Sequence, residues 1–451
     1  MNGKDRVLNA LSFQPVDRTP WVPYAGVQTA NLLGMDAETY LKDADNIVNG
    51  ILKAYELYQP DGLPVLFDIQ MEAEALGCKL KWAKCNPPAV AMHILDEKNL
   101  SELSLPTETS GRYPIALEAA RKLVAALGDK VALYALICGH FTLALHLRGT
   151  DIFTDMIEEP EKAAEIMEFC TQVAKDLARM YADAGVDIIA VVDPMTSQIS
   201  PRHYKKFVAP YITDLNQYIH SLGLKATSFC CGDATKNIEL MCQTETDGIA
   251  FDENVDLAFA KEIASKYRVS YGGNLPLTTV MLFGSPMENV EEAKRELKIG
   301  QGTGYILSPG CDMPFETPVN NIVAISNYIN GNFASIEMLE SDRQMEEEEV
   351  VEFSDVEIKP GQVFIEIVTL DSEGCPPCQY MCEAVKRVMP QYEGRLVWRE
   401  SLVKTRAGIK RMAHLRVKNL PAMLINNEVV FDNIIPTEKQ LIAEIEKRIG
   451  Q

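Results

Sequence analysis

Short apolar runs alternate with longer amphipathic stretches through the first 330 residues, and this alternation restricts the fold more than any other feature. Residues 160–184, one of the amphipathic stretches, begin with Pro160 and are followed by Gly185, both typical of helix boundaries. We expect eight buried strands at residues 20–25, 62–67, 131–137, 186–192, 224–230, 248–251, 268–273 and 303–308. Strands and helices in this order predict an α/β fold, a TIM (β/α)8 barrel over residues 1–335, with a doubly wound sheet as the alternative.

Polar, glycine and thiol residues follow the predicted strands. Because the carboxyl ends of barrel strands meet at one face, where active sites of this fold lie, we expect these residues to converge there. Four of them are candidates for substrate binding: Tyr24, Asp68, His140 and Asn274. Asp193, Asp252, Cys231 and Cys311 are placed in the same way.

The sequence changes character after residue 335. Residues 336–360 contain the acidic run 346–349, which predicts a solvated linker between two domains. Residues 361–451 have the order strand, helix, strand, helix, two strands and helix, which resembles a thioredoxin or glutaredoxin fold.

A Cys-Pro-Pro-Cys motif stands where the first helix of this second domain begins. The helix dipole favours the thiolate of Cys375, so we expect Cys375 to attack and Cys378 to resolve the resulting mixed disulfide. Pro421 matches the proline that faces this motif in thioredoxin-like folds, and Cys382 is expected to be a buried structural thiol. A metal knuckle is the alternative, but the sequence has no second Cys-x-x-Cys.

Two further thiols belong to the predicted barrel. Cys231, in "TSFCCGDATKN", and Cys311, in "YILSPGCDMP", follow the fifth and eighth predicted strands. Two thiolates with one nitrogen or oxygen ligand hold Zn²⁺ with an open position, and such a zinc binds an incoming thiol as its thiolate. The alternative is that both are ordinary buried cysteines.

Composition excludes several partners. The formal net charge of −21 argues against nucleic acid and against an anionic membrane surface. No stretch approaches the roughly 18 consecutive apolar residues of a membrane span. Eleven cysteines without a secretory signal indicate a reducing compartment, and we expect a cytoplasmic protein.

The barrel segment resembles the uroporphyrinogen decarboxylase superfamily and, within it, the corrinoid-dependent methyltransferases. Runs that carry the resemblance include "DRVLNALSFQPVDRTP", "GHFTLALHLRGTDIFTDMIEEPE" and "GYILSPGCDMPFETPVNNIVA". The decarboxylases have an arginine-rich segment after the first strand that grips substrate carboxylates. The corresponding "VPYAGVQTANL" contains no arginine, so porphyrinogen decarboxylation is not expected.

The methyltransferase branch implies zinc bound by a His-x-Cys-Gly motif and a later Gly-Cys. Cys231 and Cys311 match the two cysteines, but Phe229 stands at the histidine position. The resemblance therefore implies either a metal site with a different third ligand or a relative without zinc. We consider Cys230 first as that ligand, and after it three other residues, His140, Asp193 and Asp233.

The function expected from the resemblance is methyl transfer between a cobalamin carried by a separate corrinoid protein and a thiol or methylated small molecule. Asp193, Asp252 or Glu72 would protonate a leaving oxygen or sulfur. Two alternatives stay open: a decarboxylase or other lyase on the same barrel, and a thiol–disulfide oxidoreductase for which the barrel is a binding platform.

Overall fold

The computed structural model describes residues 1–333, 358, 361–392 and 394–449. They belong to two compact units, residues 1–344 and residues 345–451. The linker predicted at 336–360 lies outside the described residues, except for residue 358. Within the described chain, no helix combines the length and apolarity needed to cross a membrane.

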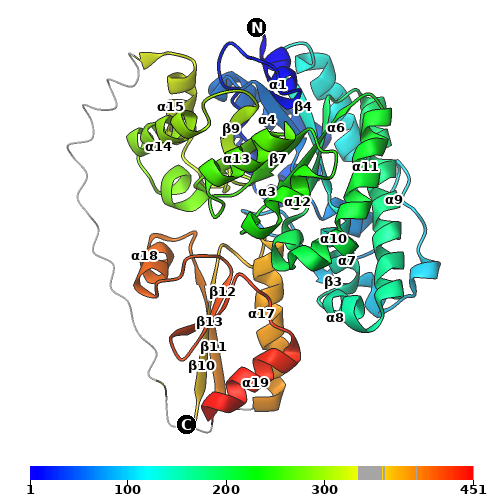
Figure 1. Ribbon diagram of the computed structural model, residues 1–451, viewed down its shortest axis with the longest axis vertical. Helices are drawn as coiled ribbons and strands as arrows, with labels where there is room; N and C mark the ends of the chain where they lie inside the picture. Colours follow the sequence, from blue (N-terminus) through cyan, green and yellow to red (C-terminus); the bar gives the residue numbers. More distant parts are fainter. Residues whose placement is uncertain (334–357, 359–360, 393, 450–451) are drawn as a thin grey trace. The chain divides into compact units, whose positions relative to one another are not determined.

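A curled parallel sheet forms the centre of the first unit (Figure 1). Every residue of its strands is buried except Lys225, because one face lines the interior and the other meets helices. In sheet order the seven strands are β1 (Gly62–Leu66), β4 (Ala132–Cys138), β5 (Ile188–Val192), β6 (Lys225–Cys230), β7 (Gly248–Phe251), β8 (Ser270–Leu275) and β9 (Tyr305–Pro309).

The predicted strand at residues 20–25 fills the gap between β9 and β1. Trp21 bridges Leu307 in parallel, and the Val22 N–H donates to the Leu307 carbonyl at 3.0 Å. On the other side, the Asp61 N–H donates to the Trp21 carbonyl at 2.8 Å, immediately before β1. The segment is a single bridge rather than a full strand, since prolines at 20 and 23 lack the N–H groups that a ladder requires. The predicted α/β barrel is confirmed with this difference.

Helices connect the strands and cover the outside of the sheet (Figure 1). The long helix α9 begins at Pro160 and ends before Gly185, whose φ of 92° lies in the left-handed region that glycine adopts readily.

The antiparallel pair β2 (Lys79–Lys81) and β3 (Ala89–Met92) forms a separate small sheet. The helices are α1 (Gly3–Leu11), α2 (Gln28–Leu32), α3 (Ala37–Leu41), α4 (Ala44–Tyr58), α5 (Met71–Ala75), α6 (Tyr113–Leu127), α7 (His140–Arg148), α8 (Asp151–Glu158), α9 (Pro160–Ala184), α10 (Pro201–Phe207), α11 (Ala209–Ser221), α12 (Ile238–Cys242), α13 (Leu257–Tyr267), α14 (Pro286–Ile299) and α15 (Val319–Ile329).

The second unit is a four-stranded mixed sheet with helices, and its elements follow the order expected from the sequence. The strands lie in the order β11-β10-β12-β13; β10 is parallel to β11 and antiparallel to β12, and β12 is antiparallel to β13. The elements are β10 (Val363–Thr369), α17 (Pro376–Val388), β11 (Leu396–Leu402), α18 (Arg406–His414), β12 (Ala422–Ile425), β13 (Glu428–Asp432) and α19 (Glu438–Ile449).

Candidate functional site

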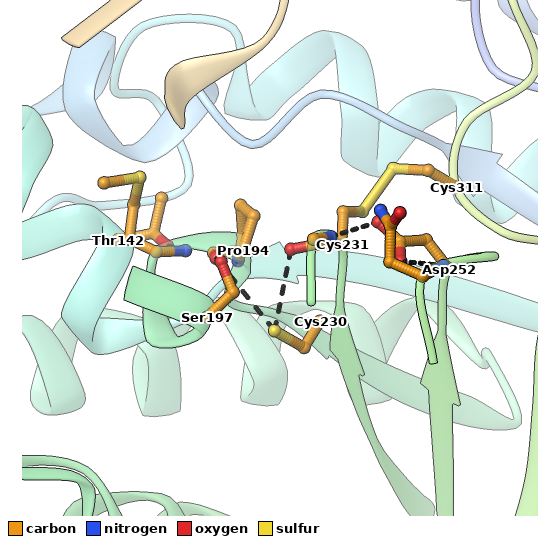
Figure 2. Close-up of a disulfide and its surroundings, with 10 residues drawn as sticks. Thr142, Pro194, Ser197, Cys230, Cys231, Asp252 and Cys311 are labelled. Carbon is orange, nitrogen blue, oxygen red and sulfur yellow. Dashed lines mark hydrogen bonds between the residues drawn. A yellow bond between two sulfur atoms is a disulfide. The ribbon is translucent and has the colours of Figure 1, made fainter. Parts of the chain in front are cut away.

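Cys231 and Cys311 meet at the carboxyl ends of the barrel strands and form a disulfide (Figure 2). Cys231 follows β6 and Cys311 follows β9, and their Cα atoms are 6.0 Å apart although 80 residues separate them in the chain. The next residue, Gly232, has a φ of 92°, which lets the chain turn sharply after β6. The structure thus brings together the two sulfurs that the sequence predicts to be metal ligands.

Cys230 is turned away from this disulfide, on the other side of the strand end (Figure 2). Its sulfur lies 3.3 Å from the Thr196 hydroxyl and 4.0 Å from the Pro194 carbonyl oxygen. Burial raises the pKa of the Cys230 thiol to about 12. This placement follows the alternation of side chains along a strand. It puts Cys230 in the packing outside the sheet, and not beside the sulfurs of Cys231 and Cys311.

Phe229, at the position where the resemblance leads one to expect a histidine, is part of an aromatic cluster. Its ring centroid lies 4.8 Å from that of Tyr24 and 6.0 Å from that of Phe67. Tyr24 is buried, and its hydroxyl hydrogen-bonds to Ser308. The predicted substrate-binding residue Tyr24 therefore lies in the interior of the barrel, packed against Phe229.

Two consecutive carboxyl groups, Asp252 and Glu253, flank the cysteines from the end of β7. Asp252 Oδ2 accepts a hydrogen bond from the Gly232 N–H, next to Cys231. Glu253 approaches Gly310, next to Cys311, so closely that a Cβ on Gly310 would lie 2.7 Å from Glu253 Oε2. Burial raises the pKa of Asp252 to about 6 and that of Glu253 to about 8, and the neighbouring Asp252 charge adds to the second shift.

Asn274 at the end of β8 holds the loop that carries these carboxyl groups. Its side-chain amide donates to the Asp252 carbonyl at 2.9 Å and to the Val255 carbonyl at 2.7 Å. Asn274 has a φ of 85°, a left-handed conformation that asparagine adopts more readily than most residues. It was predicted to bind substrate, and in the structure it positions the acidic loop.

Asp193 caps the start of α7. Its carboxylate accepts from the Thr142 N–H at 2.8 Å, from the Thr142 hydroxyl at 2.6 Å and from the Phe141 N–H at 3.2 Å. Burial raises its pKa to about 6. These hydrogen bonds satisfy N–H groups at a helix N-terminus that would otherwise lack partners.

Asp68 and Glu72 belong to a separate buried group of charges. Asp68 Oδ2 lies 2.7 Å from a guanidinium nitrogen of Arg112, and Glu72 Oε1 accepts from the Cys138 N–H at 2.7 Å. Burial raises the pKa of Glu72 to about 8. Arg112, which also pairs with Glu74 at 2.6 Å, was not predicted from the sequence, because nothing near it marks it as a partner of Asp68.

His140 faces the helical layer. Its Nε2 lies 3.1 Å from the Phe207 carbonyl oxygen, and its ring centroid lies 5.4 Å from that of Tyr211. Burial lowers its pKa to about 4, so the ring is neutral at pH 7. Its contacts are with α10 and α11, and no described contact joins it to the cysteine pair.

The structure thus brings Cys231, Cys311 and Asp252 together and places Glu253 beside them, a strand-end residue to which the sequence assigned no role. The described residues contain no group of three or more histidine, cysteine, aspartate or glutamate side chains arranged to hold a metal ion. The disulfide is consistent with this, because two sulfurs bonded to each other are not thiolates and cannot act as thiolate ligands.

In the second unit, Cys375 is the N-cap residue of α17 and is half-buried. Cys378, one turn along the helix, is buried, and this burial raises the pKa of its thiol. Cys382 is also buried, and burial raises the pKa of its thiol as well. Pro421, preceded by a cis peptide bond, stands immediately before β12.

Residues 2–331 match the protein family Uroporphyrinogen decarboxylase (URO-D). The chain is similar to the methylcobamide:CoM methyltransferase MtbA of Methanosarcina acetivorans, with 28% identity over 328 residues that cover 71% of this chain and 95% of the relative. It is also 28% identical, over 327 residues, to the methylated-thiol–coenzyme M methyltransferase of Methanosarcina mazei, covering 71% of this chain and 86% of the relative.

Among solved structures, a methyltransferase from Methanosarcina mazei aligns with a TM-score of 0.68 and 22% identity, covering 74% of this chain and 99% of that chain. At this identity the likeness establishes the fold alone. These three matches leave between 26% and 29% of the chain uncovered.

Proposed function

The chain belongs to the uroporphyrinogen decarboxylase family, and we propose that it is a corrinoid-dependent methyltransferase of that family. It would move a methyl group between cobalamin on a separate corrinoid protein and a thiol or methylated small molecule. The similar proteins named as methylcobamide and methylated-thiol methyltransferases support this assignment. The observation that carries it is the convergence of Cys231 and Cys311 at the strand ends.

In their reduced form, these two cysteines are the residues that would hold Zn²⁺. Thiolates are preferred zinc ligands, and the carboxyl groups of Glu253, beside Gly310, and Asp252, beside Gly232, are further donors from the same strand ends. Cys230 and His140 contribute nothing here, because their side chains contact other elements. When bound, the zinc would hold an incoming thiol as its thiolate at neutral pH.

The surrounding side chains orient the site. Phe229, which precedes the cysteines on β6, packs with Tyr24 and Phe67 in an aromatic cluster inside the barrel. Asn274 fixes the backbone of the Asp252 loop, so that the two carboxyl groups stay beside the sulfurs. Holding donor and acceptor in line in such a site is the main contribution the protein makes to a displacement at carbon.

The test is methyl transfer from methylcobalamin to a set of thiols, with coenzyme M among them, by the full chain reduced with dithiothreitol. We expect transfer by the wild type and its loss in Cys311→Ser. Cys85→Ser is the matched control, since Cys85 is an exposed cysteine of the same unit that lies outside the disulfide. Equal rates in wild type and Cys311→Ser would refute the role of the pair. Release of CO₂ from a small carboxylic acid, without methyl transfer, would favour the lyase alternative.

For the second unit we propose a thioredoxin-like dithiol function. Its strand order, β11-β10-β12-β13, and a helix that begins at the Cys-Pro-Pro-Cys motif support this proposal. We expect the full chain to reduce insulin disulfides in the presence of dithiothreitol, and Cys375→Ser to abolish that reduction. A reducing compartment such as the cytoplasm would keep the nine cysteines outside the disulfide as thiols.

A further inference from the structure

One unit of the chain holds a disulfide, and the other holds a pair of free thiols at a helix N-terminus. We propose that the Cys231–Cys311 disulfide is the substrate of the Cys375–Cys378 dithiol. The chain would then supply the reductant for the two thiols on which methyl transfer depends. This inference rests on the proposed function, because that function assigns Cys231 and Cys311 to the methyl-transfer site.

The disulfide is accessible to an attacking thiolate. Cys231 and Cys311 are both half-buried at the strand ends. Of the six other cysteines in this unit, five are buried and one, Cys85, is exposed. A disulfide that can be reached from solvent, in a chain otherwise rich in free thiols, is the kind that thiol exchange acts on.

The disulfide also determines what the site can do. Formation of the S–S bond leaves neither Cys231 nor Cys311 with a thiolate, so the pair cannot bind a metal ion. Reduction restores two thiols whose Cα atoms lie 6.0 Å apart. The activity of the barrel unit would therefore depend on a supply of reducing equivalents.

The dithiol has the asymmetry that exchange requires. Cys375 is half-buried at the N-cap of α17 and is the more accessible of the two thiols. Cys378 is buried, and the raised pKa of its thiol keeps it protonated until a mixed disulfide forms beside it. One thiol is thus placed to attack and the other to resolve.

The exchange balances in two steps. The Cys375 thiolate attacks one sulfur of the Cys231–Cys311 bond, that bond breaks, and the other sulfur leaves as a thiolate. The Cys378 thiol then gives its proton to that thiolate and attacks the Cys375 sulfur, which releases the second cysteine. Two electrons pass from one pair to the other. The new Cys375–Cys378 disulfide is reduced again by an external dithiol, such as dithiothreitol in the assay.

The experiment uses the full chain and traps the intermediate. In Cys378→Ser the resolving thiol is absent, so attack by Cys375 stops at a mixed disulfide. The protein is oxidised mildly, incubated with limiting dithiothreitol, alkylated with N-ethylmaleimide and digested without reduction for mass spectrometry. We expect a peptide that links Cys375 to Cys231 or Cys311 in Cys378→Ser, and its loss in Cys375→Ser.

Three results would overturn the inference. They are the absence of any linked peptide in Cys378→Ser, linkage of Cys375 to Cys85 as often as to the pair, and equal reduction of the pair in wild type and Cys375→Ser. A failure of the proposed function is distinguishable, because fully reduced Cys375→Ser should transfer methyl groups at the wild-type rate. Loss of methyl transfer in every fully reduced protein would refute the function and leave the exchange result standing.

Discussion

Cys230 and Cys231 are consecutive in the chain, and their sulfur atoms face opposite sides of the end of β6 (Figure 2). The Cys231 sulfur is bonded to that of Cys311, whereas the Cys230 sulfur contacts Thr196 and Pro194. The hypothesis that Cys230 replaces a histidine ligand requires the strand end to present both thiols to one side. In the structure the alternation of the strand persists to its last residue, so only Cys231 points into the site.

The first prediction concerns zinc bound by the reduced protein. Cys231→Ser and Cys311→Ser should each lose most of it, because each removes one of two thiolate ligands. Cys230→Ser should keep the wild-type zinc content, since its side chain contacts Thr196 instead. Metal analysis after reduction and gel filtration without free zinc measures this. Loss of zinc in Cys230→Ser, with its thermal stability unchanged, would contradict the placement.

The second prediction is a gain of metal affinity. Phe229 and Cys231 stand two residues apart at the end of one strand, so their side chains share a face. Phe229→His should therefore add an imidazole ligand and slow the loss of zinc to a chelator. The cost is lost contact with the Tyr24 and Phe67 rings, about 1–3 kcal/mol of unfolding free energy.

Phe229→Leu is the matched control, because it removes the same ring without supplying a ligand. It should lose stability as Phe229→His does and show no change in zinc retention. If both variants retain zinc equally, residue 229 does not face the cysteine pair in the reduced protein.

Sequence periodicity predicted the barrel because strands buried on both faces produce continuous apolar runs, and each run from residue 62 onward became a strand of the sheet. The segment at Trp21 became a single bridge, because its prolines have no N–H groups to donate to the strands on either side. The strand-end rule also found Cys231, Cys311 and Asp252. It could not decide which way a side chain turns once its strand has ended.

Residues that act through tertiary partners were harder to predict. Arg112 is 44 residues from Asp68 in the chain, and only the fold shows that the two pair. His140 follows a strand as a site residue would, yet the start of α7 turns its ring toward Phe207. A strand-end position gives the face of the barrel, while the direction of the side chain depends on the next helix.

The third prediction concerns the buried ion pair of Asp68 and Arg112. The side chains are 0% and 6% exposed, so removing Arg112 leaves the Asp68 charge buried without its ion-pair partner. Arg112→Met should lower the unfolding free energy by about 3–5 kcal/mol. The double variant Asp68→Asn with Arg112→Met should recover part of that loss, as measured by urea unfolding. Additive losses would show that the two charges are not coupled.

The fourth prediction concerns the pH dependence of stability. The pKa of Glu72 is raised from 4.5 to about 8, so between these values the folded protein holds a proton that the unfolded chain has released. Stability therefore falls as pH rises through this window, by at most about 1.4 kcal/mol per pH unit from this group. Above pH 8 the contribution is constant.

Glu72→Gln removes this titration and keeps an oxygen to accept from the Cys138 N–H. Its stability relative to wild type should therefore increase steadily from pH 5 to pH 8. Other titrating groups, such as the buried His140, contribute equally to both proteins and cancel in the difference. Denaturant unfolding at a series of pH values measures the difference, and parallel curves would contradict the raised pKa.

The fifth prediction uses the close approach of Gly310 to the acidic loop. A Cβ at residue 310 would lie 2.7 Å from Glu253 Oε2 and 3.0 Å from the Asp252 Cα, so Gly310→Ala should displace Cys311 relative to Cys231. We expect a loss of about 1–3 kcal/mol in stability and slower formation of the Cys231–Cys311 disulfide under mild oxidation. In a Glu253→Ala background the nearer contact is absent, so the same substitution should cost less and slow the disulfide less. If the losses of stability are non-additive, the contact with Glu253 is the cause. A general effect of added bulk would cost the same stability in both backgrounds.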